Sequence, residues 1–256
     1  MLASTRRREI MHRLVTDGYV EAKALADELG VDASTIRRDL DALEREGQAQ
    51  RTHGGARPTP GGTAKLPYTM KEGERLTEKA AIGQAAADRV RDGQTVILDS
   101  GSTTYEVARA LRNHTGLTVI TNDLRIAKYI AETPGMRLLV TGGELLGSVF
   151  TLVGERAIAF LSDYTADWAF LGADAIDIEA GVTNMNTLEV PLKRAMITAA
   201  GHAVVVADSS KFGRRALAKV AGLDEITNIL TDSDLTPTDS QQFGDVVIQA
   251  PPTTEG

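Results

Sequence analysis

Apolar residues recur at helical spacing through the first part of the chain, and glycines separate the groups. The spacing predicts a helix over residues 5–17 that ends at Gly18, and a second over residues 22–29 that ends at Gly30. A third helical stretch follows directly. Two short helices joined by a tight turn that contains glycine are typical of a helix-turn-helix.

The third helix is expected to begin at Asp32 or Ser34, because either side chain can cap a helix. Its apolar stripe, at i, i+4 and i+7, consists of Ile36, Leu40 and Leu43. Its opposite face carries Ser34, Arg38, Asp41 and Arg45, with Arg37 on the flank. Hydroxyls and guanidinium groups on the first turns of a helix with an apolar back suit the major groove of DNA. Taken alone, the stretch also fits an ordinary amphipathic helix with a solvated charged face.

Residues 48–57 predict a small β-hairpin, the wing of a winged helix-turn-helix domain. Arg51 and His53 alternate on one face of it, within reach of a DNA backbone or minor groove. For Arg51 an ion pair with Glu44 or Glu46 is an equal alternative, and for His53 a structural role is favoured. The DNA contacts expected from this domain are Arg6, Ala33, Ser34, Thr35, Arg37, Arg38, Arg51 and His53.

Proline, glycine and threonine are concentrated after this first domain, which is expected to span residues 1–57. Residues 58–73 are therefore predicted to be a linker. A helical pattern resumes at Glu74, with Thr77 as its expected cap, and Asp92–Gly93 is expected to end it.

Residues 74–250 alternate short apolar runs with helical stretches, which predicts an α/β domain with a mostly parallel sheet. The predicted strands include residues 96–98, 117–120, 137–140, 168–171, 203–206, 229–230 and 246–248. The tail over residues 251–256 is expected to be disordered.

Polar residues are concentrated where these strands end, the edge at which such sheets bind ligands. After the first strand, Gly101 and a run of hydroxyls lead into a helix expected to open at Tyr105, which together make an anion cradle. The rim expected to hold a phosphorylated polyol includes Asp99, Ser100, Gly101, Ser102, Thr103, Thr104, Thr121, Asn122, Gly142, Gly143, Glu144, Gly154, Asp174, Asp177, Gly181, Thr183, Asp208 and Lys211. For its aspartates, helix capping after a strand is the alternative.

The net charge of −7 is unevenly distributed. Residues 1–57 hold ten basic and ten acidic residues, so the remainder carries the whole negative charge. All but one of the basic residues in the first part are arginine, which binds phosphate and guanine bidentately. A neutral head with clustered arginines on an acidic body fits DNA contact by the head alone.

Other classes of site and location are excluded by composition. The absence of cysteine excludes disulfides, thiol catalysis and cysteine-bound metal, and the four histidines lack metal spacing. No metal and no cofactor is therefore expected. The sequence has no long apolar run and no signal-peptide pattern, so we expect a cytoplasmic protein, nucleoid-associated when bound to DNA, without a membrane partner.

The run Thr35-Ile36-Arg37-Arg38-Asp39-Leu40, followed by Arg51-Thr52-His53-Gly54-Gly55-Ala56, resembles the signature of DeoR/GlpR-type bacterial transcriptional regulators. The family usually has serine where Asp32 stands here. Either residue caps a helix, so the difference bears on operator choice and leaves the expected fold unchanged.

The body is similar to the sugar-phosphate sensor domain of the same family, and in turn to ribose-5-phosphate isomerase and glucosamine-6-phosphate deaminase. The matching runs are residues 99–103, 121–122, 142–143, 172–177 and 208–212. The resemblance implies a ribose-5-phosphate-isomerase-like α/β sensor domain in which Gly101, Ser102 and Thr103 hold the phosphate.

The same resemblance raises an enzyme alternative. Asp174 and Asp177 match the acidic pair of the isomerase, and Glu189 lies near the place of its catalytic base, so proton transfer at a sugar carbon is conceivable. The isomerase also has a lysine after its acidic pair, which this chain lacks. Lys193 lies at i, i+4 from Glu189 and is expected to pair with it. Glu189 and Lys193 are therefore assigned to effector binding, and no enzyme is expected.

By this resemblance the protein is a repressor of a sugar-catabolism operon, released from operator DNA by a phosphorylated sugar or polyol effector. One head makes few base contacts, so a homodimer or tetramer is expected, reading half-sites roughly 10 bp apart or at multiples of that spacing. The alternatives are a degenerate or moonlighting sugar-phosphate isomerase and a DNA-binding structural protein without a ligand.

Overall fold

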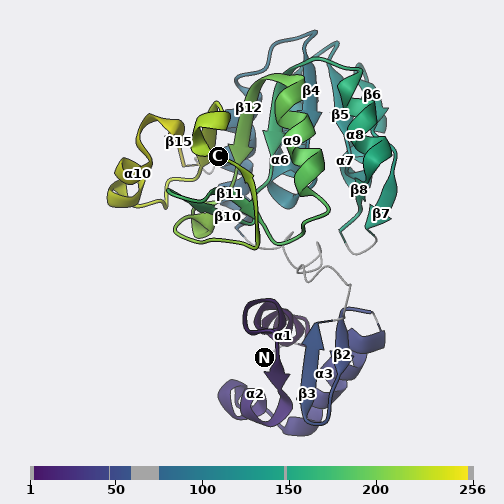
Figure 1. Ribbon diagram of the computed structural model, residues 1–256, viewed down its shortest axis with the longest axis vertical. Coiled ribbons are helices and arrows are strands. Elements are labelled where there is room, and N and C mark those ends of the chain that lie inside the picture. The colour runs from purple at the N-terminus through teal and green to yellow at the C-terminus, as the bar shows by residue number, and fades with distance from the viewer. Residues whose placement is uncertain (1–2, 46, 59–74, 147–148, 253–256) are drawn as a thin grey trace. The chain divides into compact units, whose positions relative to one another are not determined.

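The computed structural model describes residues 3–45, 47–58, 75–146 and 149–252, which belong to two compact units (Figure 1). The units comprise Met1–Lys71 and Glu72–Gly256. Their division falls in the stretch predicted as a linker, residues 58–73, most of which lies outside the described residues, as does most of the predicted tail over 251–256. In the described part of the chain, no helix is long and apolar enough to cross a membrane.

The first unit is a winged helix-turn-helix. Its helices are α1 (Ala3–Asp17), α2 (Ala22–Leu29) and α3 (Ala33–Arg45). Its strands β1 (Val20–Glu21), β2 (Ala49–Arg51) and β3 (Gly55–Pro58) form an antiparallel sheet in the order β1-β3-β2. The three helices and the hairpin predicted from the apolar spacing are confirmed.

The apolar stripe of α3 forms the centre of this unit. Ile36, Leu40 and Leu43 are wholly buried, and they pack in one cluster with side chains from α1 and α2. Asp32, not Ser34, caps α3, because its carboxylate accepts a hydrogen bond from the Ser34 amide at 2.7 Å. The predicted amphipathic pattern therefore sets which side of α3 faces the core.

A buried ion pair also joins α3 to α1. Asp39 of α3 is buried and pairs with Arg6, which is itself buried, while Arg7 Nε lies 3.2 Å from the other Asp39 oxygen. Gly55 allows β3 to pack closely against β1, because a Cβ at this position would lie 1.8 Å from the Val20 carbonyl oxygen of β1. Any larger residue would separate β3 from β1.

The second unit is built on a seven-stranded sheet whose strands are all parallel, in the order β15-β14-β12-β9-β4-β5-β6 (Figure 1). The strands are β4 (Thr95–Leu98), β5 (Thr118–Thr121), β6 (Arg137–Val140), β9 (Ala166–Leu171), β12 (Ala200–Val206), β14 (Asn228–Thr231) and β15 (Val247–Gln249). Each predicted apolar run falls on one of them, because strands covered on both faces need apolar residues in succession.

Helices cover both faces of this sheet. α5 (Leu76–Ala87), α6 (Ser102–Ala110) and α7 (Leu124–Ala131) supply the cluster that packs on Val96 and Leu98. α8 (Glu155–Ser162) and α9 (Val190–Ala199) supply the cluster that packs on Ile97. Successive residues of β4 therefore point to opposite faces, as the strand period requires.

Two smaller antiparallel sheets and one further helix complete the unit. They are the hairpin β7 (Glu144–Leu146) and β8 (Thr151–Val153), the sheet of β10 (Ala175–Asp177), β11 (Gly181–Asn184) and β13 (Ala218–Ala221), and α10 (Pro237–Phe243). The helix after the linker is shorter than predicted. α5 begins at Leu76 with Arg75 at the cap position, so Thr77 is already inside the helix, and it ends at Ala87, before Asp92–Gly93.

We expect Asp39→Ala to unfold the first unit selectively, since it removes the buried carboxylate that pairs with Arg6 and Arg7. Breaking a buried ion pair costs about 3–5 kcal/mol, a large share of what so small a unit can have. Hydrogen exchange should show protection lost over residues 3–58 and kept over residues 75–252. Asp27→Ala, at an exposed position of α2, is the control. Unchanged protection of α3 in Asp39→Ala would contradict the assigned role.

Candidate functional site

The first turns of α3 present polar side chains to the exterior. Ser34, Arg37 and Arg38 are exposed, and Ala33 and Thr35 are half-buried. No residue in the described ranges forms a hydrogen bond or ion pair with the guanidinium group of Arg37 or Arg38. The start of α3 thus offers two guanidinium groups that no described residue binds, with the hydroxyls of Ser34, which bonds Asp32, and Thr35 beside them.

Asp32 places a carboxylate beside these arginines. Hydrogen bonds from Ser34 lower the pKa of Asp32, and the charges of Arg37 and Arg38 lower it further. The group is therefore negative at neutral pH. It caps the helix, and it also adds a negative charge at the surface where DNA phosphates are expected.

The wing lies against α3 through Arg51. Its guanidinium group pairs with Asp41 at 3.1 Å and donates to the Gly55 carbonyl oxygen at 2.7 Å. The sequence analysis gave Glu44 or Glu46 as the alternative partner of Arg51. Glu44 instead accepts a hydrogen bond from the Arg51 backbone amide, and Glu46 lies outside the described residues. The side chain of Arg51 therefore holds the wing in place, and His53 is exposed between the two strands.

Arg6 does not lie where a DNA contact was expected. It is buried and paired with Asp39, so its guanidinium group stabilises the packing of α1 on α3. The sequence placed Arg6 in a run of three arginines, and that run suggested an exposed basic cluster. Asp39, buried within the third-helix motif, is the acidic partner that the sequence analysis did not assign.

The anion cradle of the second unit is built at the start of α6. The helix begins at Ser102, three residues earlier than predicted, with Gly101 at its cap in a conformation (φ 153°) that favours glycine. Thr104 Oγ1 donates to the Gly101 carbonyl oxygen at 2.9 Å. Within the described ranges, the hydroxyls of Ser102 and Thr103 form no hydrogen bond. Two hydroxyls and the first amides of a helix thus face an edge of the sheet without protein partners.

A buried ion pair lies directly before this cradle. Asp99, at the end of β4, pairs with Lys193 of α9, and both side chains are almost wholly buried. Lys193 Nζ also donates to the Gly172 carbonyl oxygen at 2.8 Å, while the Gly172 amide donates to Asp99 at 3.0 Å. The pair that Lys193 was expected to form with Glu189 is replaced by one across elements, from α9 to β4.

Burial raises the pKa of Asp99, and Lys193 opposes that rise. Glu189 adds to it, since a second carboxylate disfavours the charged form of the first. Lys193 is therefore the neighbour that most strongly favours the charged form of Asp99.

Glu189 is held by two amides that the sequence analysis missed. Asn184 Nδ2 and Asn186 Nδ2 donate to its two carboxylate oxygens at 2.8 and 3.2 Å. The amide oxygens of Asn122 and Asn184 are buried and have no hydrogen-bond partner among the described residues. Unsatisfied buried acceptors at the ligand edge are candidates for bonding ligand hydroxyls.

Asp208 and Lys211 follow β12 at the same edge. Asp208 is buried and caps the short helix η2 (Ser209–Lys211) by accepting from the Ser210 amide at 3.1 Å. Burial disfavours its charged form, but Lys211, Ser210, Lys79 and Arg75 together hold the pKa of Asp208 below its ordinary value. The capping alternative is thus realised, and the carboxylate is charged as well.

Several residues expected on the rim have contacts typical of structural roles. The Thr121 hydroxyl donates to the Leu98 carbonyl oxygen, and the Thr183 hydroxyl donates to the Ala175 carbonyl oxygen. Asp177 accepts two amides of its own turn and pairs with Arg215 at 3.0 Å. It lies at the opposite end of β10 from Asp174, so the expected pair of carboxylates is not side by side.

Glycines on the expected rim are explained in the same way. A Cβ at Gly143 or Gly181 would lie 2.4 or 2.2 Å from a backbone oxygen of the neighbouring strand. Gly154 caps α8, while Gly142 lies two residues before β7 and Glu144 is its first residue, both exposed. The structure therefore brings together a smaller set: the cradle with Asp99, Asn122, Glu189 and Lys193. In the described residues, no group of three His, Asp or Glu side chains could hold a metal ion.

Two family models match consecutive parts of the chain. The DeoR-like helix-turn-helix domain matches residues 6–59, and the DeoR C terminal sensor domain matches residues 74–233. The chain belongs to the DeoR family. The winged unit is its helix-turn-helix domain, and the unit with the parallel sheet is its sensor domain.

Curated relatives match along almost the whole chain. The HTH-type transcriptional regulator GlpR of Haloferax volcanii is 37% identical over 92% of this chain and 92% of its own length. The glycerol-3-phosphate regulon repressor of Escherichia coli K12 is 31% identical over 91% of this chain and 92% of its own. Among solved structures, ribose 5-phosphate isomerase A of Methanocaldococcus jannaschii is 20% identical with a TM-score of 0.39, covering 52% of this chain and 53% of that one.

We expect Lys193→Met to destabilise the DeoR sensor domain by about 3–5 kcal/mol at neutral pH, because it leaves Asp99 buried without its partner. The pKa of Asp99 then rises further. An acid whose folded pKa is raised loses stability as pH climbs from its unfolded pKa towards its folded one, so the deficit should shrink from about pH 8 to about pH 5. Urea unfolding at both pH values measures this.

The double variant Asp99→Asn/Lys193→Met is the matched control, since it has no titrating group at this position. Its stability relative to the parent should not change between those pH values through this site. A single variant with a pH-independent deficit would show that the ammonium group does not keep Asp99 charged.

Proposed function

We propose that this DeoR-family protein is a repressor of a sugar-catabolism operon, which binds operator DNA through α3 and is released by a phosphorylated sugar or polyol. The observation that carries the proposal is the pair of guanidinium groups at the start of α3 that no described residue binds, in a chain whose sensor domain has an anion cradle with two hydroxyls that no described residue bonds. A relative is named the glycerol-3-phosphate regulon repressor, and glycerol 3-phosphate is a phosphorylated polyol of a kind that such a cradle can hold.

The exposed end of α3 supports DNA recognition by the head. Arg37 and Arg38 present donors that can bind guanine or phosphate bidentately, and Ser34 and Thr35 offer short hydroxyls beside them. One such helix makes few base contacts, so the protein is proposed to act as a homodimer or tetramer on repeated half-sites. A repressor of this kind acts in the cytoplasm, on the nucleoid.

The rim supports recognition of a phosphorylated polyol. The phosphate is proposed to lie on the amides and hydroxyls of Ser102 and Thr103, where the positive end of the α6 dipole favours an anion. Ligand hydroxyls can donate to the unpartnered amide oxygens of Asn122 and Asn184. The set selects a phosphate at one end and hydroxyls further along, which is the chemistry of a sugar phosphate.

Binding without catalysis is the function that these contacts favour. A proton-transfer reaction at a sugar carbon needs a cation for the enediolate. Lys193, the candidate cation, is buried in its pair with Asp99 and donates to Gly172 as well. Glu189, the candidate base, is bonded by Asn184 and Asn186. We therefore propose that the site senses its ligand and does not convert it.

Release of operator DNA requires that the effector bind the two forms of the protein unequally. A tenfold loss of operator affinity corresponds to about 1.4 kcal/mol of coupling, which one or two hydrogen bonds can supply. The coupling is reciprocal, so operator DNA weakens effector binding by the same factor.

We expect Arg38→Ala to lower operator affinity at least about tenfold while the fold stays intact, because guanidinium contacts to bases or phosphates are lost. Fluorescence anisotropy with a promoter fragment, compared with bulk DNA, measures the effect. Arg45→Ala, in the last turn of the same helix, is the control and should retain affinity. Near-native affinity of Arg38→Ala would remove α3 as the recognition helix.

We expect Thr103→Glu to abolish the effector response and to leave operator binding unchanged, because a carboxylate in the cradle repels a phosphate. Operator release is followed with glycerol 3-phosphate, ribose 5-phosphate and glucosamine 6-phosphate at millimolar concentration. Thr165→Glu, exposed at the other edge of the sheet, should respond as the parent does. An unchanged release curve for Thr103→Glu would place the phosphate elsewhere.

A further inference from the structure

A cluster of charged side chains surrounds Arg75, the first described residue after the predicted linker. The cluster lies at the carboxyl ends of β12 and β14, the edge that carries the ligand rim. The Arg75 guanidinium group contacts Asp234 at 2.7 Å, Ser209 Oγ at 3.0 Å, Asp232 at 3.1 Å, Asp208 at 3.6 Å and Glu78 at 3.7 Å. One side chain thus joins the beginning of the sensor domain to two strand ends.

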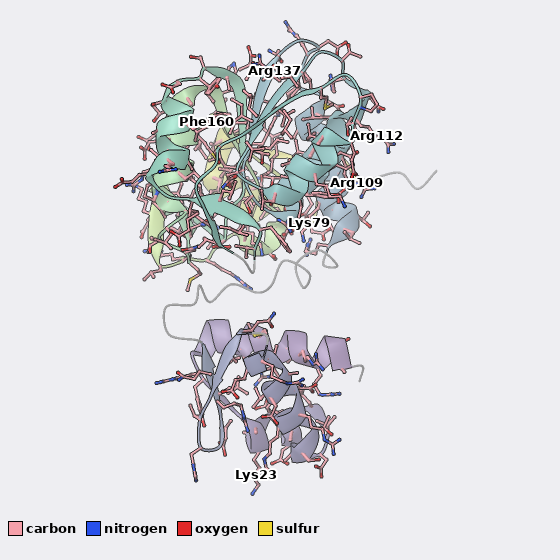
Figure 2. The ribbon with its side chains drawn as sticks, turned by 90° about the vertical axis from the view of Figure 1, so that its right-hand side faces the viewer. Lys23, Lys79, Arg109, Arg112, Arg137 and Phe160 are labelled. Carbon is pink, nitrogen blue, oxygen red and sulfur yellow. The ribbon has the colours of Figure 1, made fainter. Side chains whose placement is uncertain are left out.

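The backbone of Arg75 is held in an unfavourable conformation. Its φ of 52° lies in the left-handed region, which costs conformational energy in a residue other than glycine. The Lys79 amide donates to the Arg75 carbonyl oxygen at 3.0 Å, so this conformation also sets the first turn of α5. Figure 2 shows Lys79 in that turn. The contacts of Arg75 with the two strand ends offset the conformational cost of its backbone. Weakening these contacts would therefore destabilise the first turn of α5.

The same contacts involve residues of the proposed ligand site. Asp208 faces Arg75, Lys79 and Lys211, and these three cations lower its pKa against the effect of burial. The Arg75 Nε atom is buried near Asp208 and has no hydrogen-bond partner among the described residues. Asp208 Oδ1 therefore interacts with Arg75 Nε as an ion pair at 3.6 Å, without a hydrogen bond. A ligand hydroxyl that bonds Asp208 would compete with it.

We propose that Arg75 couples the ligand rim to the start of the sensor domain: its contacts with Asp208, Asp232 and Asp234 maintain the form that binds operator, and a sugar phosphate at the rim weakens them. Arg75 acts as a positioning residue and does not touch the phosphate. The inference rests on the proposed function and specifies how that site is regulated.

The test compares Arg75→Gln with Arg89→Gln in the full chain. Gln removes the charge at residue 75, while Arg89 lies past the other end of α5 and contacts Asn228 at 3.4 Å, away from the rim. Without any sugar phosphate, Arg75→Gln should bind the promoter fragment about tenfold more weakly than the parent, in the usual range of allosteric coupling. Arg89→Gln should bind as the parent does. Arg75→Gln with parental operator affinity would overturn the proposal.

Hydrogen exchange gives a readout that does not need DNA. The amide of Lys79 should exchange faster in Arg75→Gln than in the parent, and Arg89→Gln should leave it unchanged. Arg75→Lys keeps the charge but loses the planar fork, so it should restore part of both the protection and the operator affinity. If Arg75→Gln does not fold, Arg75→Lys alone decides, since parental values in that variant would show that the fork is not needed.

The outcomes separate the inference from the function on which it rests. If glycerol 3-phosphate, ribose 5-phosphate and glucosamine 6-phosphate all leave the parent on its operator and Arg75→Gln still weakens binding, the proposed effector class is wrong. Arg75 then maintains the form that binds operator, but no sugar phosphate acts through it. If one of them releases the parent and releases Arg75→Gln by the same factor, the effector is right and Arg75 does not transmit its binding.

Discussion

The buried pair of Asp99 and Lys193 is the interaction on which the arrangement of the sensor domain depends. It joins the end of the inner strand β4 to helix α9, and the Gly172 backbone between them bonds both charges. An isolated carboxylate at this depth would be too costly, so α9 cannot move away from the sheet without exposing or neutralising Asp99. Because the anion cradle begins at the very next residues, this pair also fixes the position of the cradle relative to α9, which carries Glu189 at its cap.

The DNA-binding head also contains a buried ion pair that joins two of its elements. Asp39 is buried under α3 and pairs with Arg6 and Arg7 of α1, while the apolar stripe of α3 fills the rest of the contact. The acidic residue of the motif thus faces inward, and the two arginines before it remain exposed. In both units a charge pair inside the protein decides which neighbouring polar groups remain for a ligand, since groups used in packing are not free to bind one.

The sequence predicted the elements that follow from the periodicity of apolar residues. It was a poorer guide to contacts between side chains that are far apart in the chain. The seven strands and the three helices of the head follow from apolar spacing, because burial repeats with the period of each element. Sequence could not show that Arg6 turns inward, that Lys193 pairs with Asp99 in place of Glu189, or that Asn184 and Asn186 hold Glu189, since each partner comes from a different turn or element. Thr183 and Gly181 were assigned to the rim from their chemistry in the sequence, and the fold shows contacts with neighbouring strands that the sequence could not show.

The ion pairs formed by basic residues near the rim determine which groups remain to bind a ligand. Lys193 forms an ion pair with Asp99, and Arg75 forms ion pairs with the carboxylates at the ends of β12 and β14. On the proposed site, a phosphate in the cradle meets amides, hydroxyls and a helix dipole, while Lys193 and Arg75 are engaged in ion pairs and Lys211 lies near Asp208. Such neutral donors bind an anion reversibly. On this proposal, affinity comes in large part from the ligand hydroxyls. Discrimination between sugars then falls to the residues that receive them, such as Asn122 and Asn184, whose amide oxygens have no partner among the described residues.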